Sequence, residues 1–257
     1  MLPHTLSNLS FVERFYSYPV LASTNDTARS LTEFPEAGIF VVQADRQTQG
    51  RGRTGADFFS DSVGGLWVSI LAPIVSIEQH FAHNRALSLA LCETLEAVCD
   101  KKNVCSIKWP NDIYWHDKKI CGILLENHVS NPSMLVLGFG CNITIKTDEF
   151  PTELNDIATS LLIETGKRHS HSLVLKNVLE RYHANRAAAP ARLHQTYIER
   201  LYGIHRAVEV DGHRGVFDGV EIDGRFKLKT GQILSYIMTG HLRFLSDGEN
   251  DFDRKQT

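Results

Sequence analysis

The sequence has no long apolar run, no leader-like N-terminus and no strong excess of charge of either sign. Its longest nearly apolar run, 64–75, holds twelve residues, whereas a helix needs about 20 residues to cross a bilayer. No basic segment followed by an apolar stretch opens the chain, so a secretory signal is not visible. We therefore predict a cytoplasmic protein that does not span a membrane.

Cysteine and histidine are present, but not in metal-binding arrangements. The five cysteines are odd in number and include no C-x-x-C pair, and the twelve histidines form neither H-E-x-x-H nor a cluster with zinc spacing. We expect free, buried thiols in a reducing compartment and no metal ligands. The net charge of -3 also argues against generic nucleic-acid binding.

The remaining composition is that of an ordinary globular protein. Hydrophobic residues make up 42% and charged residues 22%, which excludes a disordered or fibrous chain. The length of 257 residues fits one large domain with one small one. We expect the larger domain over 1–203, the small domain over 204–246 and a polar tail over 247–257.

The first two hundred residues mix strand and helix patterns, which predicts an α+β domain. Between 77 and 100, Leu87, Leu91, Leu95 and Val98 recur at helical spacing and predict an amphipathic helix. Runs rich in aromatic and β-branched residues predict strands at 11–20, 39–44, 66–73, 106–115, 119–126 and 134–145. Further helices are expected at 27–32, 156–164 and 172–200, the last broken at Pro190.

From about residue 205 the pattern changes to short β-prone runs separated by turns. The pairs Asp211-Gly212 and Asp223-Gly224 are hairpin signals. Five short strands in about forty residues favour a small SH3-like β-barrel appended to the α+β domain.

The most specific local signal is the loop 49–55, with the sequence Q-G-R-G-R-T-G. Its glycines allow backbone N–H groups to turn toward an anion. Arg51 and Arg53 add permanently charged guanidinium groups suited to phosphate or carboxylate. The loop is neither a Walker loop nor a G-x-G-x-x-G turn that opens a helix. Taken alone, a flexible basic surface loop explains it equally well.

A second signal is the segment K-W-P-N-D at 108–112. Pro110 cannot donate to a sheet, so it interrupts strand pairing and exposes Asn111 and Asp112 at one edge. Lys119 follows a tight turn on the returning strand, and hairpin geometry places it on the same side. The alternative is a plain hairpin with a surface Lys–Asp pair worth about 0–1 kcal/mol.

Weaker signals lie in other segments. Gly138 and Gly140, two residues apart in one strand, mark a close approach by backbone or ligand on one face. Ser23, Thr24 and Gln47 carry hydroxyl and amide groups suited to a neutral head group that forms hydrogen bonds. Each of these signals is nonspecific by itself.

Taken in order, these segments resemble the biotin–protein ligase family (biotin–[acetyl-CoA-carboxylase] ligase), in its monofunctional form without an N-terminal DNA-binding domain. The small C-terminal β module also fits the layout of the family. The resemblance covers about residues 11–145 and rests on Ser23-Thr24-Asn25, on Gln49-Gly50-Arg51-Gly52-Arg53, on Lys108-Trp109-Pro110-Asn111-Asp112, on Lys119 with Gly122-Ile123-Leu124 and Glu126, and on Gly138, Gly140 and Asn142.

The resemblance implies a mixed, largely antiparallel sheet with helices, of the class II synthetase type. Members of the family activate biotin with ATP, forming biotinyl-5′-AMP and pyrophosphate. They then transfer biotin to one lysine of the biotin carrier domain of a biotin-dependent carboxylase. ATP is thus the implied co-substrate, Mg²⁺ the implied activator and biotin the substrate.

Matching positions carry the site residues of the family onto this chain. The implied catalytic residues are Lys119, Arg53, Arg51 and Asp112. Biotin would be bound by Ser23, Thr24, Asn25, Gln47, Gly50, Arg51, Gly52, Arg53, Lys119, Gly122 and Gly138. The nucleotide would be bound by Arg53, Phe58, Asn111, Lys119, Gly140 and Asn142. Because they lack side chains, Gly122, Gly138 and Gly140 would leave space for the ligand.

Positive charge suits this chemistry, because the biotin carboxylate and ATP are both anions. Arg51, Arg53, Lys119 and Mg²⁺ would offset their repulsion and stabilise charge developing at the α-phosphorus. Asp112 is the best-placed group to take or orient the proton of the acceptor lysine. It would equally serve to orient Arg51 or Lys119, so both roles stay open.

Two positions depart from the pattern of the family. Ala56 stands where an Arg or Asn is frequent, which removes one donor for the adenylate. Phe58 stands where a Trp is frequent, and it can still pack against a purine. Only 22 residues precede Ser23, so we expect neither a DNA-binding domain nor DNA as a partner.

The sequence leaves several alternatives open. A lipoate– or octanoate–protein ligase shares the fold and the acyl-adenylate chemistry, although the loop 49–55 favours biotin. A non-catalytic module that docks RNA or protein is a second alternative, against which the net charge and the lack of stacking aromatics near the arginines count. Both monomer and homodimer are open, and the C-terminal barrel is expected to contact either ATP or the carrier domain.

Overall fold

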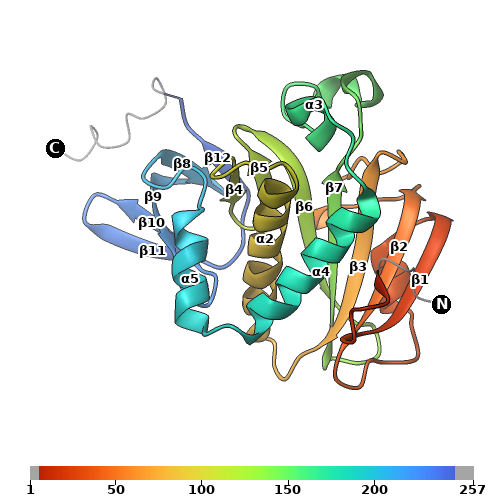
Figure 1. Cartoon of the computed structure of the whole chain (residues 1–257). Coiled ribbons are helices and arrows are strands. Elements are labelled where there is room, and N and C mark those ends of the chain that lie inside the picture. Colours follow the sequence, from red (N-terminus) through yellow and green to blue (C-terminus); the bar gives the residue numbers. More distant parts are fainter. Residues whose placement is uncertain (1–5, 247–257) are drawn as a thin grey trace.

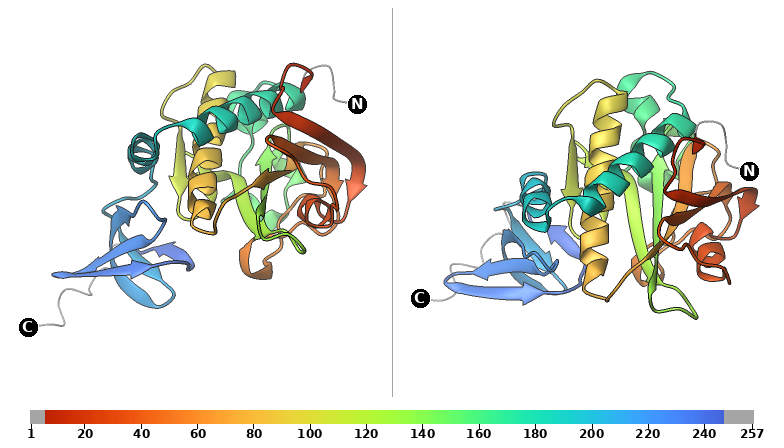
Figure 2. Two further views of the ribbon diagram at one scale, coloured as in Figure 1. Left: turned by 90° about the horizontal axis from the view of Figure 1, so that it is seen from below. Right: turned by 60° about the horizontal axis from the view of Figure 1, so that its bottom comes forward.

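The computed structural model describes residues 6–246, which form two β-sheets and the helices packed against them (Figure 1). The smaller sheet stands at one end of the molecule, far from the first strand (Figure 2). The predicted polar tail at 247–257 lies outside the described residues.

Seven strands form the larger sheet, in the order β1-β2-β3-β7-β6-β5-β4. Only β1 and β2 run parallel, and all other neighbours are antiparallel, so the predicted mixed, largely antiparallel sheet is confirmed. The central strand β7 is buried along its whole length, which explains its continuous apolar sequence. The bounds are β1 Val12–Leu21, β2 Ile39–Gln47, β3 Gly65–Pro73, β4 Cys105–Lys108, β5 Asp112–Trp115, β6 Lys118–Asn127 and β7 Met134–Asn142.

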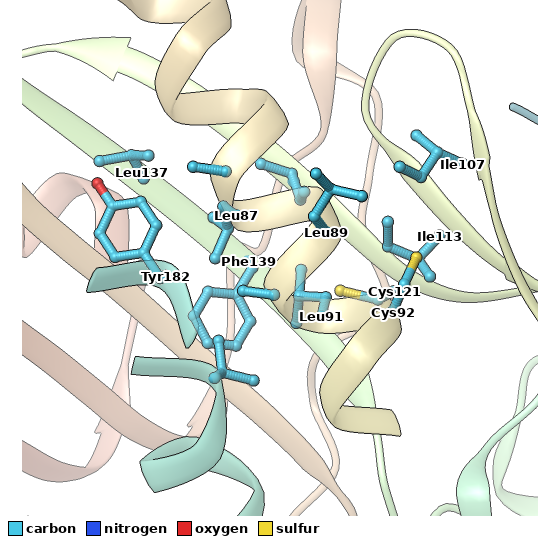
Figure 3. Packing of buried hydrophobic residues seen from close by; sticks show 14 of the residues in the cluster. Leu87, Leu89, Leu91, Cys92, Ile107, Ile113, Cys121, Leu137, Phe139 and Tyr182 are labelled. Atoms are coloured by element: carbon cyan, nitrogen blue, oxygen red, sulfur yellow. The ribbon is translucent and has the colours of Figure 1, made fainter. Parts of the chain in front are cut away.

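Helix α2 (Gln79–Val98) lies across one face of this sheet, beside α4 (His171–Ala187). Leu87 and Leu91 are fully buried, as their helical spacing predicts. Figure 3 shows them close to Phe139 of β7. Burial of each leucine contributes about 2 kcal/mol, so the helix holds the middle of the sheet in place.

Proline determines two breaks in the chain. The predicted strand 106–115 is wrong in extent: it is two strands, β4 and β5, which pair with each other across the turn that contains Pro110. The predicted break at Pro190 is confirmed, because α5 (Pro190–Glu199) begins there. Every helix within residues 6–246 is too short or too polar to span a bilayer.

Two short helices differ from their predicted bounds. Helix α1 (Thr24–Arg29) begins directly after its capping residue and so ends before the predicted range 27–32 does. Helix α3 (Leu161–Thr165) covers only the end of the range 156–164. In both cases a serine cap fixes the first turn.

The predicted C-terminal β module is confirmed as a five-stranded antiparallel sheet, in the order β11-β10-β9-β8-β12. Asp211 and Gly212 both have positive φ at the first hairpin, as the Asp-Gly signal predicts. The module contacts the larger sheet through Trp109, whose Nε1 donates to the carbonyl of Gly224 at 3.1 Å. The bounds are β8 Ala207–Val210, β9 His213–Val220, β10 Phe226–Thr230, β11 Ile233–Ile237 and β12 Leu242–Phe244.

Candidate active site

A cavity of about 540 Å³ opens where α1, the loop 49–55, the β4–β5 turn and the strands β6 and β7 meet the C-terminal sheet. Segments far apart in the chain therefore converge on one space. All residues predicted for the site line it except Gly50 and Asn142. Those that do are Ser23, Thr24, Asn25, Gln47, Arg51, Gly52, Arg53, Phe58, Asn111, Asp112, Lys119, Gly122, Gly138 and Gly140.

A buried hydrogen-bond network joins neutral polar groups of the cavity lining. The N–H and the hydroxyl of Thr24 both donate to Gln47 Oε1, at 2.7 and 3.0 Å. The Ser69 hydroxyl donates to Asn25 Oδ1 at 2.6 Å, and Ser23 caps α1 by accepting from a backbone N–H in its first turn. Because Gln47 Oε1 is engaged, its amide nitrogen is the group left to donate to a ligand.

Ser69 was not predicted as a site residue, although it interrupts the apolar run 64–75. It is fully buried in β3, and a buried hydroxyl needs a hydrogen-bond partner. A polar residue inside an otherwise apolar strand is the signal that points to such a network.

The strand glycines leave space that protein side chains occupy. A Cβ at Gly138 would lie 2.1 Å from Asn25 Oδ1, and a Cβ at Gly140 would lie 2.4 Å from the ring of Phe58. A Cβ at Gly122 would also meet that ring, at 2.8 Å. The space that these glycines leave, predicted to hold a ligand, is therefore occupied by the side chains of Asn25 and Phe58, which line the cavity.

Arg51 is held by two carboxylates. Its guanidinium donates to both oxygens of Asp26, at 2.6 and 2.5 Å, and to Glu126 at 3.1 Å. Glu126 also accepts from Asn25 Nδ2 at 2.7 Å. The hydrogen bond from Arg51 holds the pKa of Asp26 below its usual value. Arg51 thus fastens the loop to α1, and its charge is largely offset.

Arg53 instead reaches the connection between β11 and β12 of the C-terminal module. Its guanidinium donates to the hydroxyl of Thr239 and, at 3.4 Å, to the carbonyl of Gly240. Burial lowers its pKa, and the carboxylates of Asp112 and Asp211 act in the opposite direction. The cavity is closed on this side by residues that the sequence did not predict, namely Asp211, Thr239, Gly240, His241 and Leu242.

Lys119 and Asp112 form an ion pair at one wall, with Nζ 2.7 Å from Oδ1. The ammonium also lies 5.4 Å from the centre of the Phe58 ring. Lys108 is a further cation on the cavity lining. It belongs to the motif at 108–112, but it was not predicted as a site residue. Burial lowers its pKa, with Asp112 opposing. This wall therefore combines two lysines with one carboxylate.

Gly50 and Asn142 have roles in the scaffold. Asn142 is buried and donates from Nδ2 to the carbonyl of Thr159 at 2.9 Å. The Gly50 carbonyl accepts from the N–H of Phe58 at 3.0 Å, which closes the base of the loop. Neither residue is brought to the cavity lining, because each is engaged with a neighbouring segment.

The cavity lining combines two kinds of groups. Neutral hydroxyl and amide groups are joined in the network around Thr24 and Gln47, and the cations Lys108, Lys119 and Arg53 also line the cavity. Such a lining suits a ligand that has a neutral head and a negatively charged group. Within residues 6–246 no three His, Cys, Asp or Glu side chains cluster closely enough to hold a metal ion.

Comparison with known proteins gives consistent matches. A model described as the Biotin/lipoate A/B protein ligase family matches residues 17–142. The "Bifunctional ligase/repressor BirA" of Bacillus spizizenii is 34% identical over 163 residues, which cover 62% of this chain and 50% of that protein. "Biotin--protein ligase 2" of Arabidopsis thaliana is 35% identical over 136 residues, 49% of this chain and 39% of that protein. The chain spans about half the length of the curated relatives it matches.

Solved structures extend the likeness over most of the chain. The biotin protein ligase from Aquifex aeolicus, in complex with biotin and ATP, has a TM-score of 0.79 and 27% sequence identity, and the match covers 91% of this chain and 99% of that chain. The C-terminal sheet therefore belongs to the shared architecture.

Proposed function

Because the chain belongs to the Biotin/lipoate A/B protein ligase family, we propose that it is an ATP-dependent biotin–protein ligase, a biotin–[acetyl-CoA-carboxylase] ligase. It activates biotin as biotinyl-5′-AMP and transfers the biotinyl group to a lysine of a biotin carrier domain. The observation that carries the proposal is the convergence of the motif segments on one cavity, whose lining combines neutral polar groups with the cations Lys108, Lys119 and Arg53.

Biotin would lie along this cavity. Its neutral ureido ring suits the polar groups around Thr24 and Gln47, where the hydrogen-bond network is already formed, and preformed donors and acceptors limit the entropy lost on binding. Its carboxylate would then point toward Lys119 and the cationic wall.

In the first reaction a carboxylate oxygen of biotin attacks the α-phosphorus of ATP, and the bond to pyrophosphate breaks. Two anions must approach, so positive charge at the meeting point lowers the barrier. Lys119, Lys108 and Arg53 would supply it, because all three line the cavity. Arg51 would contribute by fixing the loop, since its own charge is offset by Asp26 and Glu126.

Mg²⁺ is proposed as the activator that arrives with ATP. Magnesium is commonly held by one or two carboxylates together with substrate phosphates, and Asp112 and Asp211 are carboxylates on the cavity lining. The donor set therefore fits an ion carried mainly by the triphosphate. When bound, it would neutralise negative charge on the phosphates.

In the second reaction the neutral amine of the acceptor lysine attacks the biotinyl carbonyl, and AMP leaves. Asp112 would take the proton of that amine or orient Lys119. Its ion pair with Lys119 at 2.7 Å supports the orienting role.

The proposal predicts a specific product. Incubation with biotin, Mg-ATP and a biotin carrier domain should give a carrier that is heavier by one biotinyl group on a single lysine, detected by mass spectrometry. A Lys119→Ala variant should lose at least about 100-fold in rate, because a cation at the reacting centre contributes about 2.7–4 kcal/mol. Absence of product with the unmodified chain contradicts the proposal.

The matching family also includes lipoate ligases, so the acid must be tested directly. Exchange of labelled pyrophosphate into ATP should require biotin and should not be supported by lipoate or octanoate. Exchange with lipoate alone would assign the alternative activity.

We further propose a cytoplasmic location and a carrier domain of a biotin-dependent carboxylase as the partner. We also propose a division of the chain at 203/204 into a catalytic domain and a small β domain. The monomer and the homodimer both remain compatible with the proposal.

A further inference from the structure

A second cavity, of about 370 Å³, lies where the N-terminal ends of α2 and α5 meet the C-terminal end of α4. These helix ends come together at the bottom of Figure 1. The cavity shares no lining residue with the candidate active site. The proposed ligase reaction gives it no role.

Arg85 is the notable residue of this cavity. Arg85 is only 2% exposed, and its Nε atom is buried without a hydrogen-bond partner. Nη1 donates to the carbonyl of Ile222 at 3.1 Å and lies 3.3 Å from Nδ1 of His194. Within residues 6–246 no carboxylate forms an ion pair with Arg85. A buried guanidinium without a counter-charge is costly, so an anion from outside is the expected partner.

The Arg85 guanidinium lies 5.5 Å from the centre of the Phe81 ring, but no carboxylate of residues 6–246 pairs with it. Arg186 also lines the cavity and forms no ion pair with the described part of the chain, while its guanidinium lies 5.6 Å from the centre of the Tyr182 ring. Burial, together with the nearby Arg186 and His80, lowers the pKa of His83 to about 3, so His83 is neutral at pH 7. Among residues 6–246, no Asp or Glu lines the cavity.

The rest of the wall is mostly apolar. Ile74 and Leu193 are buried contributors, and Ala82 and Pro190 complete the surface. A bare inorganic ion would leave this wall without contacts. A ligand with a short apolar body would bury it, at about 25 cal/mol per Å² of apolar area.

We propose that this cavity binds a small aliphatic carboxylate, with its carboxylate on the guanidinium groups of Arg85 and Arg186 and its chain against Ile74 and Leu193. The planar edge of a guanidinium matches the two oxygens of a carboxylate, and Arg85 must turn toward the cavity to present that edge, because its Nε is buried in the structure. The positive ends of the α2 and α5 dipoles add to the attraction.

Binding of a carboxylate in this cavity should also change the surroundings of residues outside it. Arg85 donates to Ile222, which lies in the turn between β9 and β10 of the C-terminal sheet. A carboxylate that redirects the guanidinium should alter the surroundings of the Ile222 and Asp223 amides. This gives a readout that nonspecific binding of a fatty chain elsewhere would not produce.

The test is a titration of the full chain with hexanoate, followed by NMR. We expect saturable shifts of the Ile74 and Leu193 methyl groups and of the Ile222 amide. Hexanol should bind at least about tenfold more weakly, because it lacks the charge. Inorganic phosphate that binds as tightly as hexanoate, or hexanoate that causes no shift at these groups, overturns the proposal.

Two variants locate the binding. Arg85→Lys keeps the charge but loses the planar fork, and Ala82→Leu fills the cavity without changing charge. Each should weaken hexanoate binding by at least about tenfold, which corresponds to about 1.4 kcal/mol. Arg192→Gln removes an exposed arginine of α5 outside the cavity and should bind hexanoate as the unmodified chain does. Should Arg85→Lys fail to fold, undiminished binding by Ala82→Leu alone contradicts the proposal.

Discussion

Arg51 and Asp26 form a bidentate ion pair, with Nη1 2.6 Å from Oδ2 and Nη2 2.5 Å from Oδ1. The pair joins the basic loop to the first turn of α1. Glu126 of β6 adds a second carboxylate to the same guanidinium at 3.1 Å. The two arginines of the loop therefore act differently: Arg51 anchors the loop to the larger sheet, and Arg53 contacts the C-terminal module.

Asp26→Asn should loosen the loop without unfolding the protein. The side chain of Asp26 is 47% exposed, and exposed ion pairs contribute only about 0–1 kcal/mol to stability. Loss of the anchor should instead let biotinyl-5′-AMP escape about tenfold faster, equivalent to about 1.4 kcal/mol. The measurement is the release of adenylate from preloaded enzyme, alongside thermal unfolding.

The matched control is Asp61→Asn. Asp61 also pairs with an arginine, Arg46, at 3.4 Å, but it does not line the cavity. Adenylate release should stay at the unmodified rate in this control. Equal release from both variants and from the unmodified chain would show that Arg51 does not anchor the loop.

Asp112→Asn distinguishes the two roles left open for this carboxylate. If Asp112 orients Lys119, the amide misplaces the ammonium group, and a displacement of about 1 Å at a reacting centre costs about 100-fold in rate. We expect this loss in pyrophosphate exchange, the first reaction. Normal exchange with slow transfer from preformed adenylate would assign the base role instead.

The control for this experiment is Asp117→Asn, which changes the neighbouring turn. Asp117 accepts a hydrogen bond from Tyr202 at 2.7 Å and does not line the cavity. Both reactions should proceed normally in this variant.

Local signals in the sequence predicted much of the fold and the site. The spacing of Leu87 and Leu91 predicted α2, because a helix repeats its buried face every three to four residues. A short helix was also predicted near α1, at 27–32, although α1 begins at Thr24, directly after its serine cap. The two motifs at 49–55 and 108–112 predicted the cavity wall because their residue types are chemically specific.

Tertiary contacts account for what the sequence could not predict. Thr239 and Gly240 contact Arg53 from the connection between β11 and β12, and no local sequence pattern indicates that contact. Asn142 belongs to a motif, yet its amide is taken by the Thr159 carbonyl. Glu126 belongs to a motif, but its role was not predicted from the sequence, because its partner Arg51 lies on a distant segment of the chain.

Gly138→Ala tests the contact between β7 and α1. The new Cβ would lie 2.1 Å from Asn25 Oδ1, so Asn25 must move and lose its bond to Ser69. Overpacking of this kind costs about 1–3 kcal/mol in stability. Biotin binding, measured by calorimetry, should weaken by at least about 100-fold, because the network around Thr24 and Gln47 is broken.

The double variant Gly138→Ala/Asn25→Ala provides the control. Removal of the Asn25 amide relieves the clash, so thermal stability should recover in part. Biotin binding should not recover, because the hydrogen bonds of Asn25 remain absent. Normal binding by Gly138→Ala would mean that this network does not shape the site.

His83 should make stability fall as the pH is lowered. Burial is the main reason that its folded-state pKa is about 3, against a usual value of 6.5. Below pH 6.5 the unfolded chain binds a proton that the folded chain does not, so unfolding becomes easier by up to about 1.4 kcal/mol per pH unit. Between pH 7.5 and pH 5 the loss should be about 2 kcal/mol.

His83→Gln removes this contribution while other histidines keep theirs. The difference in unfolding free energy between pH 7.5 and pH 5, measured by urea titration, should therefore be about 2 kcal/mol smaller than in the unmodified chain. His213→Gln changes an exposed histidine of β9 and should keep the full difference. If His83→Gln shows the same pH dependence as the unmodified chain, the imidazole is not buried in its neutral form against Tyr182, whose hydroxyl lies 2.7 Å from Nδ1.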